Sequence, residues 1–279
     1  MSGFVVTRLS TTPVKGLRVN HPASVMLEAN GAAGDRDFLL VDESGRLISL
    51  TGLGPLVRLT ATWNSESGRL TVRADDGEVC DGEVDLGDAV DVDFFGYEKR
   101  PGRLVLGPWN RMFERITGKR LRLVKLAVPG SGSDVRPVTL LGEASIRGLE
   151  RASGLHVDPR RFRMLIQFAS MEAHVEDTWE GASVHVGSAR LRIGATVPRC
   201  AATTRNPERG DRDAPVVKAI KDYRGLQKTG FGRGVPFGVY ADVMTGGVVR
   251  VGDELRVRGE ALRDPSVKKP SDVTDSSKR

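Results

Sequence analysis

Short apolar or alternating runs fill most of the chain, separated by glycine, aspartate and asparagine, and they predict a mainly β protein with a few helices. In the first half these runs predict strands at Phe4–Leu9, Ser24–Leu27, Phe38–Val41, Leu47–Leu50, Val57–Trp63, Leu70–Arg73, Val90–Phe95 and Leu121–Leu126. In the second half they predict strands at Val138–Leu141, Phe162–Phe168, Ser183–Val186, Arg190–Ile193, Phe237–Val243 and Glu254–Arg258. Short strands at this spacing are typical of a meander or a barrel.

Three segments break the strand pattern and predict helices. Trp109, Met112, Phe113 and Ile116 recur at the spacing of one helix face, which places Trp109 in the core. A second helix is expected over Glu143–Ser153, ended by Gly154, and a third over Ala214–Tyr223, with Asp213 as its N-terminal cap.

The segment 128–134 has a linker-like composition of glycine, serine and proline. It predicts either a domain boundary or a long mobile loop, and hence a β-rich barrel domain over 1–127 and a second domain over 128–263. Residues 264–279 are rich in lysine, serine, aspartate and proline, and this composition predicts a disordered tail.

The cysteines and the charge narrow the classes of function. Cys80 and Cys200 are the two cysteines of the 279-residue chain, and their spacing argues for a reducing compartment and against structural zinc or a cysteine-held iron–sulfur cluster. The N-terminus has no secretory leader and no apolar run is long enough to span a bilayer, so a cytoplasmic protein is expected. The net charge of +6 is spread along the chain and aromatic residues make up only 5%, which disfavours nucleic-acid binding and leaves a small anion as a target for the arginines.

Cys200 is the first candidate for chemistry. Arg199 precedes it, and a neighbouring guanidinium stabilises the thiolate, the form that attacks electrophiles or ligates soft metals. The alternative is a buried cysteine that acts as a small hydrophobic residue. Cys80 follows Glu78 in an acidic stretch that opposes thiolate formation, so it is interpreted as structural.

Several cations are candidates for holding an anion. If Phe162–Phe168 is one strand, Arg161 and Arg163 share the face opposite Phe162. Lys15, followed by Gly16, and Arg36 stand at loop–strand junctions where they can bind phosphate. Taken one at a time, each of these cations is better explained as a solvated surface charge.

Taken together, these motifs resemble the MOSC domain family, named from the C-terminal domain of molybdenum cofactor sulfurases, preceded by the MOSC N-terminal β-barrel domain. The resemblance is carried in the first half by residues 13–16 (PVKG) and 35–38 (DRDF). In the second half it is carried by residues 143–145 (EAS), 158–163 (DPRRFR), 179–181 (WEG), 199–207 (RCAATTRNP) and 251–253 (VGD). The chain is also similar to amidoxime-reducing component proteins of this family.

The resemblance implies binding of the molybdenum cofactor, with Cys200 as the catalytic residue and metal ligand. It implies cofactor contacts from Lys15, Gly16, Arg36, Ser145, Arg163, Arg199 and Thr203. A thiolate suits a metal that is already held by the sulfurs of a pterin dithiolene. No pyridoxal phosphate is expected, because the desulfurase domain of full-length sulfurases is absent from the sequence.

Two departures from the family pattern stand in this sequence. Where amidoxime-reducing relatives read Phe-Arg-Pro-Asn, this chain has Met164-Leu165 after Arg163, and where several relatives have serine, it has Gly16. They remove a polar amide and a hydroxyl, so cofactor affinity or substrate class is expected to differ.

The resulting hypothesis is an oxidoreductase that reduces N-hydroxylated or N-oxidised small molecules with electrons from a separate ferredoxin- or flavoprotein-type partner. One alternative is a sulfur carrier or cofactor carrier that uses a persulfide on Cys200. A further alternative is a β-barrel adaptor that binds no cofactor.

Overall fold

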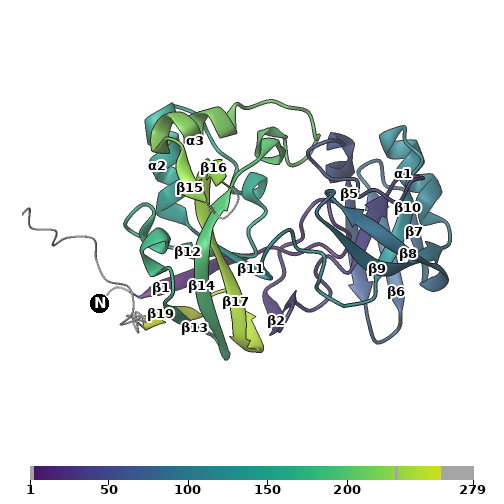
Figure 1. Cartoon of the computed structure of the whole chain (residues 1–279), viewed down its shortest axis with the longest axis horizontal. Helices are drawn as coiled ribbons and strands as arrows, with labels where there is room; N and C mark the ends of the chain where they lie inside the picture. The colour runs from purple at the N-terminus through teal and green to yellow at the C-terminus, as the bar shows by residue number, and fades with distance from the viewer. Residues whose placement is uncertain (1–2, 230–231, 259–279) are drawn as a thin grey trace, which may run out of the picture.

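The computed structural model of the chain describes residues 3–229 and 232–258, which form two lobes side by side (Figure 1). One lobe, here the barrel lobe, is built mostly from the second half of the chain, and the other, the α1 lobe, from the first half. The prediction of a mainly β fold with a few helices is confirmed. The predicted tail over 264–279 lies outside the described residues.

A closed seven-stranded barrel forms the centre of the barrel lobe. Its strands, in order around the barrel, are β1 (Phe4–Leu9), β12 (Ile166–Ala169), β11 (Val138–Gly142), β17 (Pro236–Thr245), β14 (Ala189–Pro198), β13 (Ser183–Val186) and β19 (Glu254–Arg258). Strands β11 and β12 are parallel and all other neighbours are antiparallel. The N-terminal strand closes the barrel, because Val5 pairs with Ala169 and Phe4 pairs with Leu255.

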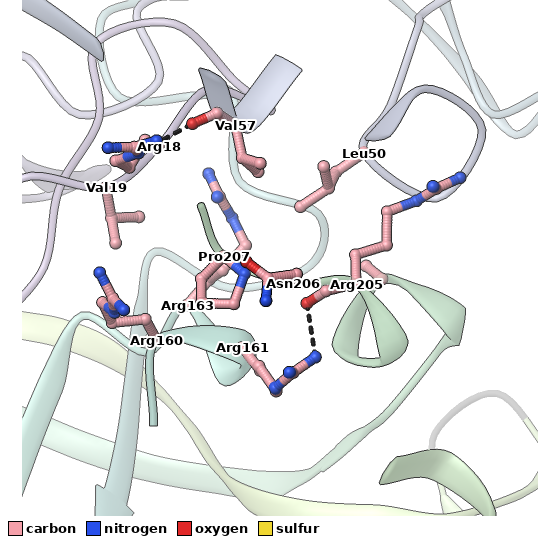
Figure 2. Close-up of a pocket in the computed structure, with 11 residues that line it drawn as sticks. Arg18, Val19, Leu50, Val57, Arg160, Arg161, Arg163, Arg205, Asn206 and Pro207 are labelled. Atoms are coloured by element: carbon pink, nitrogen blue, oxygen red, sulfur yellow. Dashed lines mark hydrogen bonds between the residues drawn. The ribbon is translucent and has the colours of Figure 1, made fainter. Parts of the chain in front are cut away.

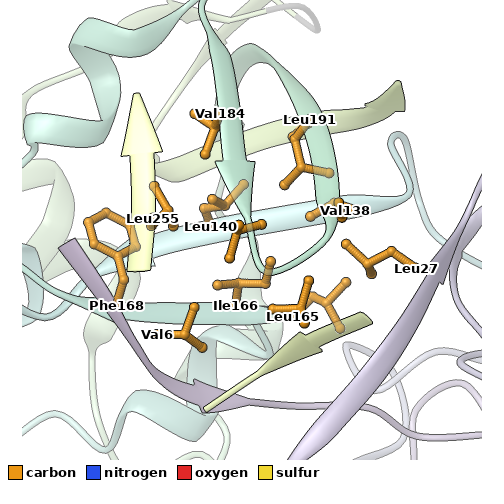
Figure 3. Packing of buried hydrophobic residues seen from close by; sticks show 14 of the residues in the cluster. Val6, Leu27, Val138, Leu140, Leu165, Ile166, Phe168, Val184, Leu191 and Leu255 are labelled. Carbon is orange, nitrogen blue, oxygen red and sulfur yellow. The ribbon is translucent and has the colours of Figure 1, made fainter. Parts of the chain in front are cut away.

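Aliphatic side chains fill the interior of the barrel (Figure 3). Leu9, Leu140, Ile166 and Leu191 are each fully buried, and burying one such side chain contributes about 1.5–3 kcal/mol. Val25 and Leu27 of β2 (Ser24–Glu28) extend the same core. The barrel is therefore a packed core that offers rigid strand ends to a site.

The α1 lobe contains two sheets. One has the order β4 (Phe38–Val41), β10 (Arg122–Leu126), β9 (Glu98–Leu106) and β8 (Asp85–Phe94), and the other has the order β5 (Leu59–Asn64), β6 (Arg69–Ala74) and β7 (Val79–Glu83). Helix α1 (Trp109–Thr117) packs its apolar face into this lobe, with Trp109 1% exposed, so the predicted helix and its core face are confirmed. Gly118 ends the helix with left-handed backbone geometry.

The remaining elements flank the barrel. They are α2 (Glu143–Ser153), α3 (Val216–Arg224), the hairpin β15 (Gln227–Thr229) and β16 (Gly232–Gly234), and the sheet β18 (Gly247–Arg250), β2 and β3 (Gly31–Ala32). Four short 3-10 helices complete the fold: η1 (Gly54–Arg58), η2 (Pro159–Phe162), η3 (Val175–Trp179) and η4 (Ala201–Thr204). Across the two described ranges, no helix has the length and apolar character to cross a bilayer.

Four predicted elements differ from the structure. Leu47–Leu50 is a turn region with only isolated bridges, and the strand expected from Val57 begins at Leu59, after η1. The strand expected over Phe162–Phe168 begins only at Ile166, because η2 and a left-handed Arg163 precede it. Asp213 does not cap α3, because its carboxylate accepts a hydrogen bond from Asn206 and pairs with Arg161.

The segment 128–134 lies against the α1 lobe. The Asp37 carboxylate accepts the Gly130 N–H at 2.7 Å, and Lys15 Nζ donates to the Gly132 carbonyl at 2.7 Å. Arg100 Nη1 donates to the carbonyl of Ser133 at 2.8 Å. The proposed division into 1–127 and 128–263 remains a prediction.

Candidate active site between the lobes

Cys200 lies at the point where the barrel lobe meets the α1 lobe. It stands two residues after the end of β14 and caps η4, where the Thr203 N–H and hydroxyl donate to the Cys200 carbonyl at 3.1 and 3.0 Å. Its side chain is exposed, and Sγ lies 3.7 Å from the Thr51 hydroxyl oxygen of the other lobe. The alternative of a buried structural cysteine is therefore wrong for Cys200. Thr203 is buried and supports the turn that presents the thiol.

The loop around Thr51 and the segment after Cys200 form a tight contact, here called the seam, defined by Thr51, Gly54, Cys200, Arg205 and Gly210. Arg205 donates from Nη2 to the Thr51 carbonyl and from Nη1 to the Gly210 carbonyl, both at 2.8 Å. A Cβ on Gly54 would lie 2.9 Å from the Gly210 carbonyl carbon, so glycine is required for this approach. The seam fixes the thiol relative to the α1 lobe.

An ion pair joins the buried Lys15 to the exposed Asp134 of the loop 128–134. Lys15 Nζ lies 2.5 Å from the Asp134 carboxylate, and Lys15 is 8% exposed. Burial lowers the pKa of Lys15 despite this partner. Burial by itself would raise the pKa of Asp134, but the charges of Lys15 and then Arg36 outweigh it and lower that pKa.

Arg36 and Arg163 both have left-handed backbone geometry, with φ of 57° and 52°. Residues other than glycine adopt this geometry at a cost, and such strain clusters at functional sites. The Arg36 guanidinium donates to the Asp35 carboxylate, whereas Arg163 Nη2 is buried with no hydrogen-bond partner among the described residues. Burial, and then the charge of Arg36, lowers the pKa of Arg163 to about 10. The alternation-based placement of Arg163 on a strand face is therefore wrong, although its guanidinium does reach the cation cluster.

Arg199 donates its hydrogen bonds to the segment before β12 and none to the thiol that follows it, among the described contacts. Nη2 donates to the Phe162 carbonyl at 2.5 Å, Nη1 lies 3.4 Å from the sulfur of Met164, and Nε is buried without a described partner. Burial lowers the pKa of Arg199, and the charges of Cys200, Tyr240 and Asp134 oppose this. Met164, one of the two departures from the family pattern, is thus a direct neighbour of Arg199.

The second departure, Gly16, has a φ of +95°, and a Cβ there would meet Leu56 Cδ1 at 3.0 Å. A serine at this position would be strained in this backbone. Leu165 is 1% exposed and belongs to the barrel core. The amide that relatives carry at its position is replaced here by core packing.

Ser145 is separate from this cluster in its described contacts. It is fully buried on α2, where its hydroxyl donates to Glu176 at 2.8 Å and accepts the His174 N–H at 2.8 Å. Cys80 lies elsewhere, half-buried on β7, where burial and then Glu78 raise the pKa of its thiol.

Of the residues predicted from the sequence, the structure brings together Lys15, Arg36, Arg163 and Arg199, whose charges all act on or with Asp134. Gly16 and Cys200 adjoin this cluster as the chain neighbours of Lys15 and Arg199. Asp134 was missed because it stands in a segment whose composition is that of a linker. Thr51 and Arg205 were also missed, and no local pattern distinguishes them. An accessible thiol beside buried cations with unpartnered N–H groups fits a metal cofactor that carries a phosphate.

Two family descriptions match the chain. Residues 128–256 match the MOSC domain and residues 3–99 match the MOSC N-terminal beta barrel domain. Mitochondrial amidoxime reducing component 2 of Bos taurus is 32% identical over 44% of this chain and 37% of its own length. Molybdenum cofactor sulfurase of Caenorhabditis elegans is 25% identical over 81% of this chain and 32% of its own length.

The chain thus spans about a third of the length of these relatives. Among solved structures, the YUAD protein from Bacillus subtilis aligns over 91% of this chain and 95% of its own, with 10% identity and a TM-score of 0.45. The two family matches together cover both lobes, and the chain belongs to the MOSC domain family, with a MOSC N-terminal beta barrel domain preceding the MOSC domain.

Proposed function

We propose that this protein binds the molybdenum cofactor between its lobes and acts as an oxidoreductase on N-hydroxylated or N-oxidised small molecules. The observation that carries the proposal is the exposed Cys200 thiol, held at the seam next to Arg199, which belongs to the cluster of largely buried cations. The family membership supports association with the molybdenum cofactor, and the similarity to amidoxime reducing components supports the reaction type.

In this proposal Cys200 ligates the metal and the cations hold the cofactor's phosphate and pterin. Arg163 offers a buried N–H without a described partner, and Lys15 would exchange its ion pair with Asp134 for the phosphate. Arg199 supports the site by fixing the Phe162 carbonyl and Met164 beneath it. Ser145 and Thr203 contribute through the local fold rather than through the cation cluster.

When bound, the cofactor would supply the two-electron redox chemistry, and the protein orients it and sets its electrostatics. Burial raises the pKa of Tyr240 to about 12, so this phenol keeps its proton at neutral pH. The cationic cluster stabilises negative charge near the thiol, and the seam holds Cys200 in one position. Electrons would come from a separate ferredoxin- or flavoprotein-type partner, and a cytoplasmic location remains a prediction.

The test measures molybdenum by elemental analysis and pterin by fluorescence in protein from a cofactor-producing host. Wild type is compared with Cys200→Ser, and Cys80→Ser is the matched control because that thiol lies outside the cluster. We expect near-stoichiometric metal and pterin in wild type and in Cys80→Ser, with metal lost from Cys200→Ser. Wild type loaded with cofactor should then reduce an N-hydroxylated base with a chemical electron donor. Equal metal in all three proteins contradicts the ligand role, and no turnover by the loaded protein contradicts the reductase.

The exposure of Cys200 also favours a second candidate, a sulfur carrier or cofactor carrier. An exposed thiol is accessible to another protein and can hold a persulfide, which a buried ligand cannot do as easily. Mass spectrometry of protein purified without reductant should detect an added sulfur on Cys200 if this candidate is right. Absence of both cofactor and persulfide would leave the adaptor hypothesis.

A further inference from the structure

A small cavity lies close to the seam, and five arginines line it (Figure 2). These are Arg18, Arg160, Arg161, Arg163 and Arg205. No aspartate or glutamate is among the described residues that line it. Its volume is about 10 Å³, which is room for about one particle of the size of a water molecule.

The ion pairs around the cavity leave positive charge in excess. Arg160 pairs with Asp158 at 2.6 Å and with Glu208 at 3.0 Å, and Arg161 pairs with Asp213 at 2.7 Å. Within the described part of the chain, Arg18, Arg163 and Arg205 have no ion pair and bond only to backbone carbonyls or to nothing. Five guanidinium groups therefore face three carboxylates, and like charges held together without counterions destabilise the fold.

Several donor atoms at this place are also unsatisfied. Arg161 is 8% exposed, and its Nε has no hydrogen-bond partner among the described residues. The same holds for Nε of Arg205, whereas the unpartnered Nη2 of Arg163 is the one assigned above to the cofactor. Buried N–H groups that lack an acceptor cost free energy, and a bound anion satisfies several of them at once.

We propose that this cavity binds one small inorganic anion of the halide class, with chloride as the physiological occupant. Size selects the halide, because tetrahedral phosphate or sulfate needs more room than a single water-sized particle takes. Arg163 lines this cavity and also belongs to the proposed cofactor site. The other four arginines have no part in the proposed cofactor binding, and the anion site does not require a bound cofactor.

The anion would join the two lobes. Arg18, Leu50 and Val57 come from the first part of the chain, and Arg160, Arg161 and Arg205 come from the second part (Figure 2). Arg205 also makes the two seam hydrogen bonds, so an anion beside its guanidinium stabilises the position of the seam. Chloride is thus expected to stabilise the fold beyond its effect on ionic strength.

The first experiment is diffraction from crystals of the purified protein soaked in bromide, with data collected at the bromine absorption edge. We expect an anomalous peak inside the cavity that the five arginines line. A map with no peak there, while peaks appear at exposed surface arginines, would overturn the proposal. This experiment needs no variant and does not depend on any cofactor.

The second experiment follows thermal unfolding at constant ionic strength while sodium chloride replaces sodium gluconate. We expect the Tm to rise by about 3 °C over the series in wild type and in the control Arg111→Gln, whose side chain is exposed on α1. Arg18→Gln removes a lining cation that has no ion pair, and its chloride-dependent rise should fall to about a third or less. Equal Tm in both salts for wild type overturns the proposal. A rise with sulfate or phosphate but not with chloride overturns the halide assignment.

Discussion

Gly54→Ala tests whether the seam fixes the two lobes. The added methyl group would overlap the Gly210 carbonyl oxygen and Arg205 Nη1, and it would also lie 2.9 Å from the Gly210 carbonyl carbon. Ordinary contact begins at 3.4 Å, so the two segments must separate by more than the shortfall at the carbonyl carbon. That separation lengthens the two Arg205 hydrogen bonds, each 2.8 Å, and moves Thr51 away from Cys200. From overpacking and the loss of these bonds, we expect the free energy of unfolding to fall by about 2–4 kcal/mol.

The matched control is Gly52→Ala, in the same loop. A Cβ on Gly52 would meet its nearest neighbour, the Ser49 carbonyl oxygen, at 3.8 Å, which is ordinary contact. Its free energy of unfolding should stay within about 0.5 kcal/mol of wild type. Urea unfolding followed by tryptophan fluorescence measures both variants. If Gly54→Ala also stays within about 0.5 kcal/mol, the seam does not constrain the lobes and the reasoning is refuted.

Three further predictions concern the site and the half-buried His174. Gly16→Ser restores the hydroxyl of relatives, but it places a side chain at φ +95° and 3.0 Å from Leu56 Cδ1. The free energy of unfolding should therefore fall by about 1–2 kcal/mol, and molybdenum per chain should not rise. A gain of metal at unchanged stability would contradict this. Lys15→Met removes the ammonium group that lies 2.5 Å from Asp134 and that is proposed to bind the cofactor's phosphate. Pterin per chain should therefore fall at least about tenfold. Pterin equal to wild type would show that Lys15 does not bind the cofactor. Burial, and then the charge of Arg224, lowers the pKa of His174 from 6.5 to about 4. Between pH 6.5 and pH 4 the unfolded chain therefore binds more protons than the folded protein, and the free energy of unfolding falls as the pH drops through this window. In His174→Phe the new ring can pack against Phe237 and Tyr223. Measured by urea unfolding, this variant should lose less free energy of unfolding than wild type between pH 7 and pH 4.5. An equal loss in both proteins would show that the imidazole does not cause the pH dependence.

Local patterns predicted the elements whose cause is local. The helix around Trp109 was found because one apolar face at helical spacing is followed by Gly118, and Glu143–Ser153 was found with its bounds. Phe4–Leu9 and Phe38–Val41 were found as strands with the observed bounds. Each of these segments carries its own periodicity and its own end signals.

The wrong predictions have non-local causes. Leu47–Leu50 has the composition of a strand but no continuous partner, and only an isolated bridge to Val41 forms. The alternation at Phe162–Phe168 fitted a strand, yet Phe162, Met164 and Leu165 are all buried because a short helix and a left-handed Arg163 rotate the chain. Which side of a segment faces the core depends here on where neighbouring strands lie.

The site was predicted in part for the same reason. Residue type alone marks a thiol or a cation as a candidate for chemistry, and this holds for Cys200, Lys15, Arg36 and Arg163. The resemblance to family motifs then assigned them to one site. Asp134 was hidden in a stretch that resembles a linker, and its importance comes from its 2.5 Å approach to a lysine 119 positions earlier (134 − 15). The contact of Gly54 with Gly210 likewise exists only once both lobes are folded.

The pairing of β1 with β12 and β19 sets the order in which the molecule can assemble. Phe4 leaves the ribosome early, but its partner Leu255 follows only after nearly the whole described chain has been made. Until then the barrel has two open edges, and open strand edges recruit other strands. A fragment that starts at the family boundary and ends with β19, residues 128–258, keeps both edges open permanently, because the strand that covers them is encoded at the other end of the chain. Such a fragment should self-associate, and adding a peptide of residues 3–10 should suppress that association.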